Sequence, residues 1–172
     1  MKPPDKFLMG ITIGVIVLVA VVFAVVLSRP AVEYKPGDSP EGIAFNYLLA
    51  IQNEDYERAY SYLSTHLQDY PKTAAEFMRD IENDRWRFRS GSSVSLDITS
   101  FDMLGDGEAV VSVRETWFNS GDLFSSSQSR KEFNIYLERE DGEWKIVDAD
   151  YYFSACWTSI NNCNYPVLPP IP

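Results

Sequence analysis

The chain has 172 residues, a formal net charge of −10, 45% hydrophobic residues and 14% aromatic residues. Such an acidic chain does not have the basic surface that binds phosphates, so we expect no nucleic-acid partner. Its length and aromatic content are sufficient for one hydrophobic core and argue against two.

Residues 7–27 form an uncharged apolar run, preceded by Lys2 and Lys6 and followed by Arg29. As a helix at ~1.5 Å per residue, the run is about 31 Å long, close to the roughly 30 Å hydrocarbon core of a bilayer. A cleaved secretory signal is the alternative, although its apolar region usually has about 7–15 residues. We therefore expect residues 1–28 to be a cytoplasmic stub and a transmembrane signal anchor, which contacts the lipid bilayer through residues 7–27.

The two cysteines of the chain, Cys156 and Cys163, lie close together near its C-terminus. A pair at this spacing, with no histidine or further cysteine nearby, is a poor zinc site and is typical of a disulfide in an oxidising compartment. This favours a single-pass protein of the cell membrane, with a cytoplasmic N-terminus and an extracytoplasmic C-terminal domain. Gly10 and Gly14 have the GxxxG spacing of close-packed membrane helices, so a homodimer is a further expectation.

Three helices are predicted after the apolar run. Residues 29–39 contain two prolines and a glycine and are interpreted as a stalk. Ser39 then stands where a helix N-cap is expected, with Pro40 at the first helical position, and the apolar spacing that follows predicts one buried face. A shorter helix is expected over residues 56–63. Thr73 has the spacing of a capping box and predicts the start of the third helix.

After Gly91 the apolar period changes from helical to alternating, which predicts antiparallel strands. The alternation slips after Ile98 and indicates a bulge near Thr99. Turns are expected at residues 105–107 and at 141–142, where Asp-Gly is a strong hairpin signal. Helices followed by four strands predict an α+β domain, with the helices on one face of an antiparallel sheet.

The order of elements and three local phrases resemble the nuclear transport factor 2-like superfamily, which includes ketosteroid-isomerase-like and SnoaL-like domains. The phrases are SPE at residues 39–41, NEDYERAY at residues 53–60 and DGEWKI at residues 141–146. The resemblance implies a cone-like domain over residues 40–154, in which about three helices pack on a curved sheet of about four strands around a pocket. Members range from isomerases and dehydratases to binding and assembly modules, so the resemblance implies a fold rather than one function.

Two acidic residues lie in phase with apolar strand residues and are the candidate catalytic groups. Glu115 follows Val111 and Val113 at intervals of two, so an inward side chain would be a desolvated carboxylate suited to general base catalysis. Asp148 stands in a similar relation to Ile146. In both cases the alternative is a solvated side chain, which a strand end or a bulge turns outward.

Three aromatic residues are candidates for lining the pocket: Tyr47, Tyr60 and Trp117. Ketosteroid-isomerase-like chemistry combines a carboxylate base with a donor such as a tyrosine hydroxyl, and either tyrosine fits that role. Aromatic residues at helical spacing are more often core residues. Because the catalytic positions of the superfamily do not match this sequence residue by residue, we assign no catalytic residue.

The remaining polar signals carry no clear chemistry. His66 is the only histidine and falls in a connection, so we expect neither a metal site nor a cofactor. Arg85, Arg87 and Arg89 alternate with aromatic residues, as in an anion site if the segment is extended, or in a capped helix C-terminus if it is helical. Residues 155–172 contain the cysteine pair and four prolines and are interpreted as a disulfide-pinned, polyproline-like tail.

These observations favour a membrane-tethered, extracytoplasmic, non-catalytic binding module of the cell envelope. Its partner would be another envelope protein or a small apolar ligand. The alternative is an isomerase- or dehydratase-like enzyme that uses a pocket carboxylate. A deep pocket with Glu115 or Asp148 beside a tyrosine hydroxyl would favour the enzyme, whereas a pocket filled by the protein's own aromatic side chains would favour the binding module.

Overall fold

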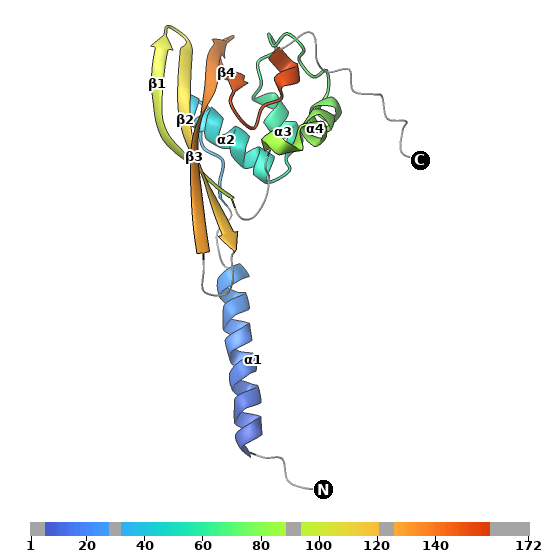
Figure 1. Ribbon diagram of the computed structural model, residues 1–172, viewed down its shortest axis with the longest axis vertical. Coiled ribbons are helices and arrows are strands. Elements are labelled where there is room, and N and C mark those ends of the chain that lie inside the picture. Colours follow the sequence, from blue (N-terminus) through green and yellow to red (C-terminus); the bar gives the residue numbers. More distant parts are fainter. Residues whose placement is uncertain (1–5, 28–31, 89–93, 121–125, 159–172) are drawn as a thin grey trace, which may run out of the picture. The chain divides into compact units, whose positions relative to one another are not determined.

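The computed structural model describes residues 6–27, 32–88, 94–120 and 126–158, and Figure 1 colours the chain from its N-terminus to its C-terminus. The chain divides into two compact units, Met1–Glu33 and Tyr34–Pro172. The division falls inside the predicted stalk, residues 29–39.

The first unit contains the helix α1 (Lys6–Leu27), whose described side chains are all exposed. Within the part of the chain that the structure describes, no helix is sufficiently long and apolar to cross a membrane. This finding contradicts the predicted transmembrane helix over residues 7–27, and with it the signal anchor, the single-pass topology and the cell-membrane location.

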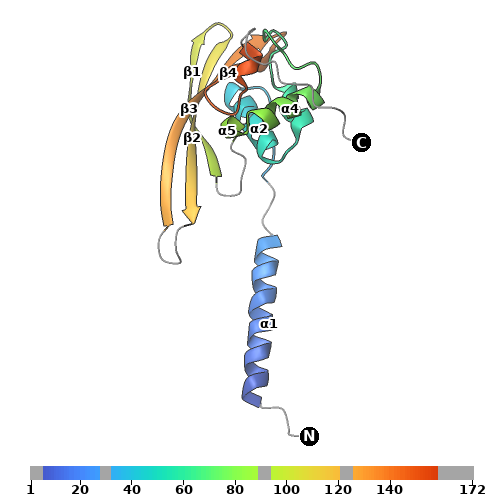
Figure 2. The same ribbon diagram turned by 45° about the vertical axis from the view of Figure 1, so that its right-hand side comes forward.

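The second unit is an α+β domain, as predicted, and its described helices lie against one face of a four-stranded antiparallel sheet (Figures 1 and 2). The helices are α2 (Pro40–Gln52), α3 (Tyr56–Ser61), α4 (Ala74–Asn83) and the single turn α5 (Arg85–Phe88). The strands are β1 (Val94–Gly105), β2 (Glu108–Ser120), β3 (Ser126–Glu140) and β4 (Glu143–Ala149), and the 3-10 helix η1 (Ala155–Thr158) follows them.

The predicted helix starts are confirmed by their capping hydrogen bonds. The Ser39 hydroxyl accepts a hydrogen bond from the Gly42 N–H at 3.1 Å, and the Thr73 hydroxyl accepts one from the Glu76 N–H at 3.1 Å. Both bonds satisfy amide groups that a helix N-terminus leaves without an intrahelical partner. The Glu76 carboxylate reaches back one residue further than a capping box requires, because it accepts from the Lys72 N–H at 2.8 Å.

α2 is buried on nearly all sides, which corrects the prediction of a single buried face. It contacts the sheet as well as α3, so polar positions outside the apolar stripe are also covered. Asn46 is only 2% exposed. Its amide donates to the Lys35 carbonyl at 2.8 Å and accepts from the Lys35 N–H at 2.7 Å, so both polar atoms of a buried side chain are satisfied.

The strands follow one another in the order β1-β2-β3-β4, and every neighbouring pair is antiparallel. The predicted bulge is confirmed by a shift of the β1–β2 register between Ile98 and Ser100. The β3–β4 hairpin turns at Asp141 and Gly142, which both have positive φ angles, 52° and 92°. Two successive residues in this conformation match the twist of an antiparallel hairpin.

The sheet places its apolar side chains on the face that packs against the helices. The core residues from β2, β3 and β4 are Ala109, Val111, Val113, Phe133, Ile135, Leu137, Trp144, Ile146 and Ala149. The outer edge of β4 is covered by the segment after α3: the Ser64 N–H donates to the Ile146 carbonyl, and the Ile146 N–H donates to the Tyr62 carbonyl, both at 2.9 Å. Covering this edge removes one site at which another strand would pair.

The start of the predicted tail, residues 155–172, belongs to the core. Trp157 of η1 is 0% exposed, and its ring stacks on Phe77 with 5.1 Å between the ring centroids. Its indole N–H donates to the Asp80 carboxylate at 2.9 Å, which satisfies the one polar group of this side chain. The part of the tail after residue 158 lies outside the described residues.

Cys156 is buried in η1 and is not a free thiol. Its predicted partner, Cys163, lies outside the described residues. No disulfide is seen between two residues that the structure describes, so the expected Cys156–Cys163 bond is not confirmed.

Candidate functional site

Of the two candidate catalytic residues, Glu115 is the one that the structure places inside the domain. It lies on the inner face of β2, opposite Leu96 of β1 and Lys131 of β3, and it is 0% exposed. Its carboxylate accepts a hydrogen bond from the Tyr152 hydroxyl at 2.7 Å. Of the two readings of the strand pattern, the structure therefore supports the inward, desolvated carboxylate.

Tyr152 holds this carboxylate and is itself held at three points. Besides donating to Glu115, it accepts a hydrogen bond at its carbonyl from the Tyr47 hydroxyl at 2.5 Å, and its N–H donates to the Arg87 carbonyl at 3.1 Å. Its ring lies 5.6 Å from the ring of Phe133. The hydroxyl therefore has a fixed place beside Glu115.

The alternating pattern of the last strand does not identify Tyr152. A strand continued to Phe153 would point Tyr152 away from the core, on the opposite side from Tyr151 and Phe153. Instead β4 ends at Ala149, and Tyr152 adopts a positive φ of 59° that directs it inward. Such a backbone is uncommon for tyrosine, and no glycine or asparagine stands here to indicate it.

Tyr47, one of the three predicted pocket residues, contacts this pair through its hydrogen bond to the Tyr152 carbonyl. It is completely buried, and burial raises the pKa of its phenol far above the ordinary value. Tyr60 instead donates to the Pro71 carbonyl at 2.8 Å and stacks on Tyr70. Trp117 lies two residues beyond Glu115 on the same face of β2 and is partly exposed.

Asp148 is exposed, in agreement with the alternative that a bulge turns it outward. The β3–β4 register passes from Tyr136↔Asp148 to Leu137↔Ile146, so one extra residue is inserted in β4. The Asp148 carboxylate accepts a hydrogen bond from the Ala149 N–H at 2.9 Å. It is therefore a surface group and does not face the Glu115–Tyr152 pair.

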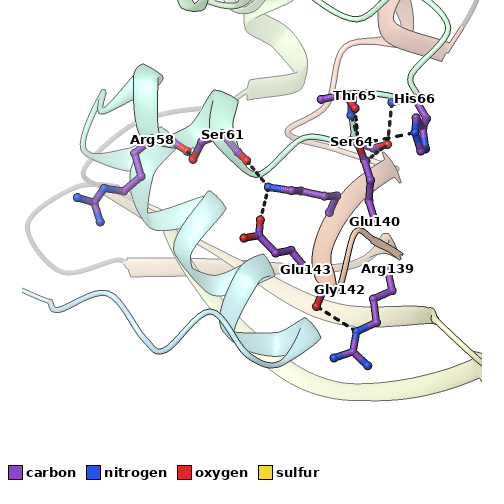
Figure 3. A network of polar contacts seen from close by, with 10 residues as sticks. Arg58, Ser61, Ser64, Thr65, His66, Arg139, Glu140, Gly142 and Glu143 are labelled. Carbon is purple, nitrogen blue, oxygen red and sulfur yellow. Dashed lines mark hydrogen bonds and ion pairs between the residues drawn. The ribbon is translucent and has the colours of Figure 1, made fainter.

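A second polar cluster joins the loop after α3 to the β3–β4 hairpin (Figure 3). The Glu140 carboxylate accepts hydrogen bonds from the Ser64 hydroxyl at 2.8 Å, from the Thr65 N–H at 3.2 Å and from the Thr65 hydroxyl. Burial raises the pKa of Glu140, but these donors and the nearby His66 outweigh burial, so the pKa lies below its ordinary value. The cluster therefore holds the carboxylate in its ionised form.

Ser64, His66 and Glu140 have the residue types of a hydrolytic triad but not its geometry. The serine hydroxyl donates directly to the carboxylate, whereas in a triad the histidine lies between the two. The His66 side chain is 76% exposed, with its Nε2 3.8 Å from the Glu140 carboxylate. This arrangement connects a loop to a hairpin and does not activate Ser64 as a nucleophile.

Two of the surface pockets are lined by residues in the described part of the chain. One, of about 660 Å³, lies where the β1–β2 and β3–β4 hairpins end, and its lining includes Met103, Gly107, Arg139 and Trp144. The other, of about 510 Å³, lies among the helices and is lined by Glu54, Tyr56, Met78, Ile81, Glu82, Arg85 and Phe88. Neither lining includes Glu115.

In its described part the arginine-rich segment is helical rather than extended, so the helical one of its two interpretations holds there. The Arg87 guanidinium lies over the Trp86 ring, 4.8 Å from its centroid, and donates to the Asp150 carbonyl at 3.3 Å. Arg89 lies outside the described residues. Among the described side chains, no group of three or more histidine, cysteine or acidic residues is placed to hold a metal ion.

No family model matches the sequence. No curated protein matches it either.

Solved structures with similar folds include an NTF-2-like protein of unknown function from Shewanella oneidensis MR-1, with 14% identity, 62% of this chain and 90% of that chain covered, and a TM-score of 0.42. A ketosteroid isomerase-like protein from Erwinia carotovora atroseptica SCRI1043 is 12% identical. The match covers 63% of this chain and 88% of that chain, with a TM-score of 0.45. The association domain of CaMKII from C. elegans is 15% identical. The match covers 62% of this chain and 87% of that chain, with a TM-score of 0.43. Two of these names coincide with the resemblance found in the sequence, and at these TM-scores we base no argument on the matches.

Proposed function

We propose that the second unit is a non-catalytic binding module. The observation that supports this proposal is the state of Glu115, the one candidate catalytic carboxylate inside the domain. Glu115 is 0% exposed, and the ring of Tyr152, itself packed against Phe133, stands beside it. A general base must come within hydrogen-bond reach of the proton that it removes, directly or through one water. The protein's own side chains occupy that space.

An isomerase- or dehydratase-like enzyme is the second candidate, because Glu115 and Tyr152 combine a carboxylate with a phenol donor. In such an enzyme the carboxylate and the donor both face the substrate. Here the Tyr152 hydroxyl donates to Glu115 itself at 2.7 Å. Tyr47 cannot replace it, since the Tyr47 hydroxyl already donates to the Tyr152 carbonyl. The pair therefore has the chemistry of a buried structural contact.

The experiment that separates the two candidates is proton exchange in deuterated water. The full chain is incubated with a panel of cyclic and linear ketones, and loss of the signal of the proton next to the carbonyl is followed by NMR. We expect the same background rate for the wild type and for Glu115→Gln. Exchange above background that disappears in Glu115→Gln would establish the enzyme and refute the binding module.

A further inference from the structure

The pocket among the helices differs from the interior around Glu115 in having an open mouth and a mixed lining. Its residues come from the turn between α2 and α3, from α3, from α4 and from α5. Figures 1 and 2 show these helices on one side of the sheet. A volume of about 510 Å³ lies within the range of roughly 300–1,000 Å³ that is usual for small-molecule sites.

The inner wall of the pocket is apolar and fixed by the core. Phe88 is 1% exposed and Ile81 is 6% exposed, while Met78 remains 39% exposed near the opening. The Phe88 ring contacts the Trp157 ring edge to face, with 6.0 Å between the centroids. This wall offers a rigid surface to an apolar or aromatic ligand body, and the flexible Met78 side chain can adjust to its shape.

The rim of the pocket is predominantly negative. It carries the carboxylates of Glu54 and Glu82, the hydroxyl of Tyr56 and one cation, Arg85. The pKa of Tyr56 is raised, first by burial and then by both carboxylates, while Arg85 opposes the shift. Both carboxylates therefore act on the Tyr56 hydroxyl. The negative potential lies at the rim of the pocket, beside its apolar wall.

Glu54 is held in place by its backbone rather than by helix geometry. It has a positive φ of 58°, and its N–H donates to the Ile51 carbonyl at 3.2 Å. The next residue, Asp55, donates its N–H to the Ala50 carbonyl at 2.9 Å. The turn between α2 and α3 thus presents Glu54 from a fixed position.

We propose that this pocket binds a protonated amine carried on an apolar or aromatic body. The ammonium group would lie between Glu54 and Glu82, near the π-face and hydroxyl of Tyr56, and the body would contact Ile81 and Phe88. An anionic ligand of the same size would meet two carboxylates and a single guanidinium. The assignment deepens the proposed function, since it names the ligand class of a non-catalytic binding module.

The test uses the full chain with its methionine and isoleucine methyl groups labelled for NMR. The probe is 2-phenylethylammonium, and 3-phenylpropionate is its anionic counterpart of similar size. We expect the ammonium probe to shift the Met78 and Ile81 signals with saturation, and the carboxylate probe to bind at least about tenfold more weakly. Equal or tighter binding of 3-phenylpropionate would overturn the proposal.

Three substitutions test which charged side chains of the pocket contribute to binding of the ammonium probe. Glu54→Gln and Glu82→Gln, both at exposed positions, should each weaken the ammonium probe about three- to tenfold, whereas Arg85→Gln should tighten it because a competing cation is removed. Glu57→Gln is the matched control, since Glu57 is exposed on α3 and does not line the pocket. Equal weakening by Glu57→Gln would show a diffuse charge effect and refute the site.

The outcome can be distinguished from a failure of the proposed function. If the ammonium probe does not shift the Met78 and Ile81 signals, the ligand assignment is wrong while the proton-exchange result still decides between module and enzyme. If exchange depends on Glu115, the proposed function is wrong whatever the pocket binds.

Discussion

At the scale of single residues, the contact between Glu115 and Tyr152 is the best-defined feature of the interior. A buried carboxylate has lost its hydration, and hydrogen bonds from protein donors must replace it. The Tyr152 hydroxyl supplies one such bond at 2.7 Å, from a residue whose backbone is fixed by Tyr47 and Arg87. Removing this donor therefore affects a polar group that is fully buried.

We predict that Tyr152→Phe lowers the free energy of unfolding by about 1–3 kcal/mol, because it removes a hydrogen bond to a buried polar group without changing the packing of the ring. The measurement is urea denaturation followed by tryptophan fluorescence. Tyr136→Phe is the control, since Tyr136 lies on the opposite face of the sheet, where substitutions usually change stability by no more than about 0.5 kcal/mol. Equal effects of the two substitutions would show that the bond to Glu115 contributes nothing.

At the scale of elements, Glu140 connects the loop after α3 with the β3–β4 hairpin. Lys145 contributes to the same junction, because its ammonium group donates to the Ser61 carbonyl at 3.1 Å and pairs with Glu143 at 3.0 Å. This junction keeps the segment that covers the edge of β4 in register with the hairpin.

We predict that Glu140→Gln destabilises the domain by about 1–2 kcal/mol at neutral pH, since hydrogen bonds to a charged acceptor become hydrogen bonds to a neutral one. The folded-state pKa of Glu140 is lowered, so its contribution is complete above the unfolded-state pKa and is lost as the pH falls through the folded-state pKa. The difference in the free energy of unfolding between the wild type and Glu140→Gln should therefore become smaller as the pH falls. Urea denaturation at a series of acidic pH values measures it.

Glu143→Gln is the matched control for this prediction. Glu143 lies on the same hairpin, is 73% exposed and forms a single ion pair with Lys145. Surface pairs of this kind contribute little, so a change below about 1 kcal/mol is expected. A difference for Glu140→Gln that stays constant with pH would contradict a role for its ionised form.

The elements also show where periodicity succeeds as a predictor. The N-caps at Ser39 and Thr73, the bulge near Thr99 and the Asp141-Gly142 turn are local features, and the structure has all of them. The full burial of α2 is different, because it depends on the sheet and α3 arriving on both sides of the helix. Spacing within one helix carries no information about a second neighbour.

At the scale of the whole molecule, the two units differ in whether their described residues include buried ones. Every residue described as buried lies from Pro40 onward, so the hydrophobic core belongs to the second unit alone. We predict that residues 34–172 fold without residues 1–33, with a free energy of unfolding within about 0.5 kcal/mol of the full chain. Urea denaturation and an amide NMR spectrum test this. A truncated chain without a cooperative transition would contradict it.

The sequence by itself determined the α+β class, the order of helices and strands, their caps and their turns, because these depend on neighbours within a few residues. It also predicted a transmembrane anchor over residues 7–27, which the described part of the structure contradicts. Only the tertiary structure decided the candidate sites. Tyr152 reaches Glu115 because β4 ends at Ala149 and the chain turns inward at a positive φ. The pocket that includes Glu54, Glu82 and Phe88 exists because α3, α4 and α5 meet in space. Contacts between residues far apart in the chain depend on packing, and periodicity along the chain does not encode them.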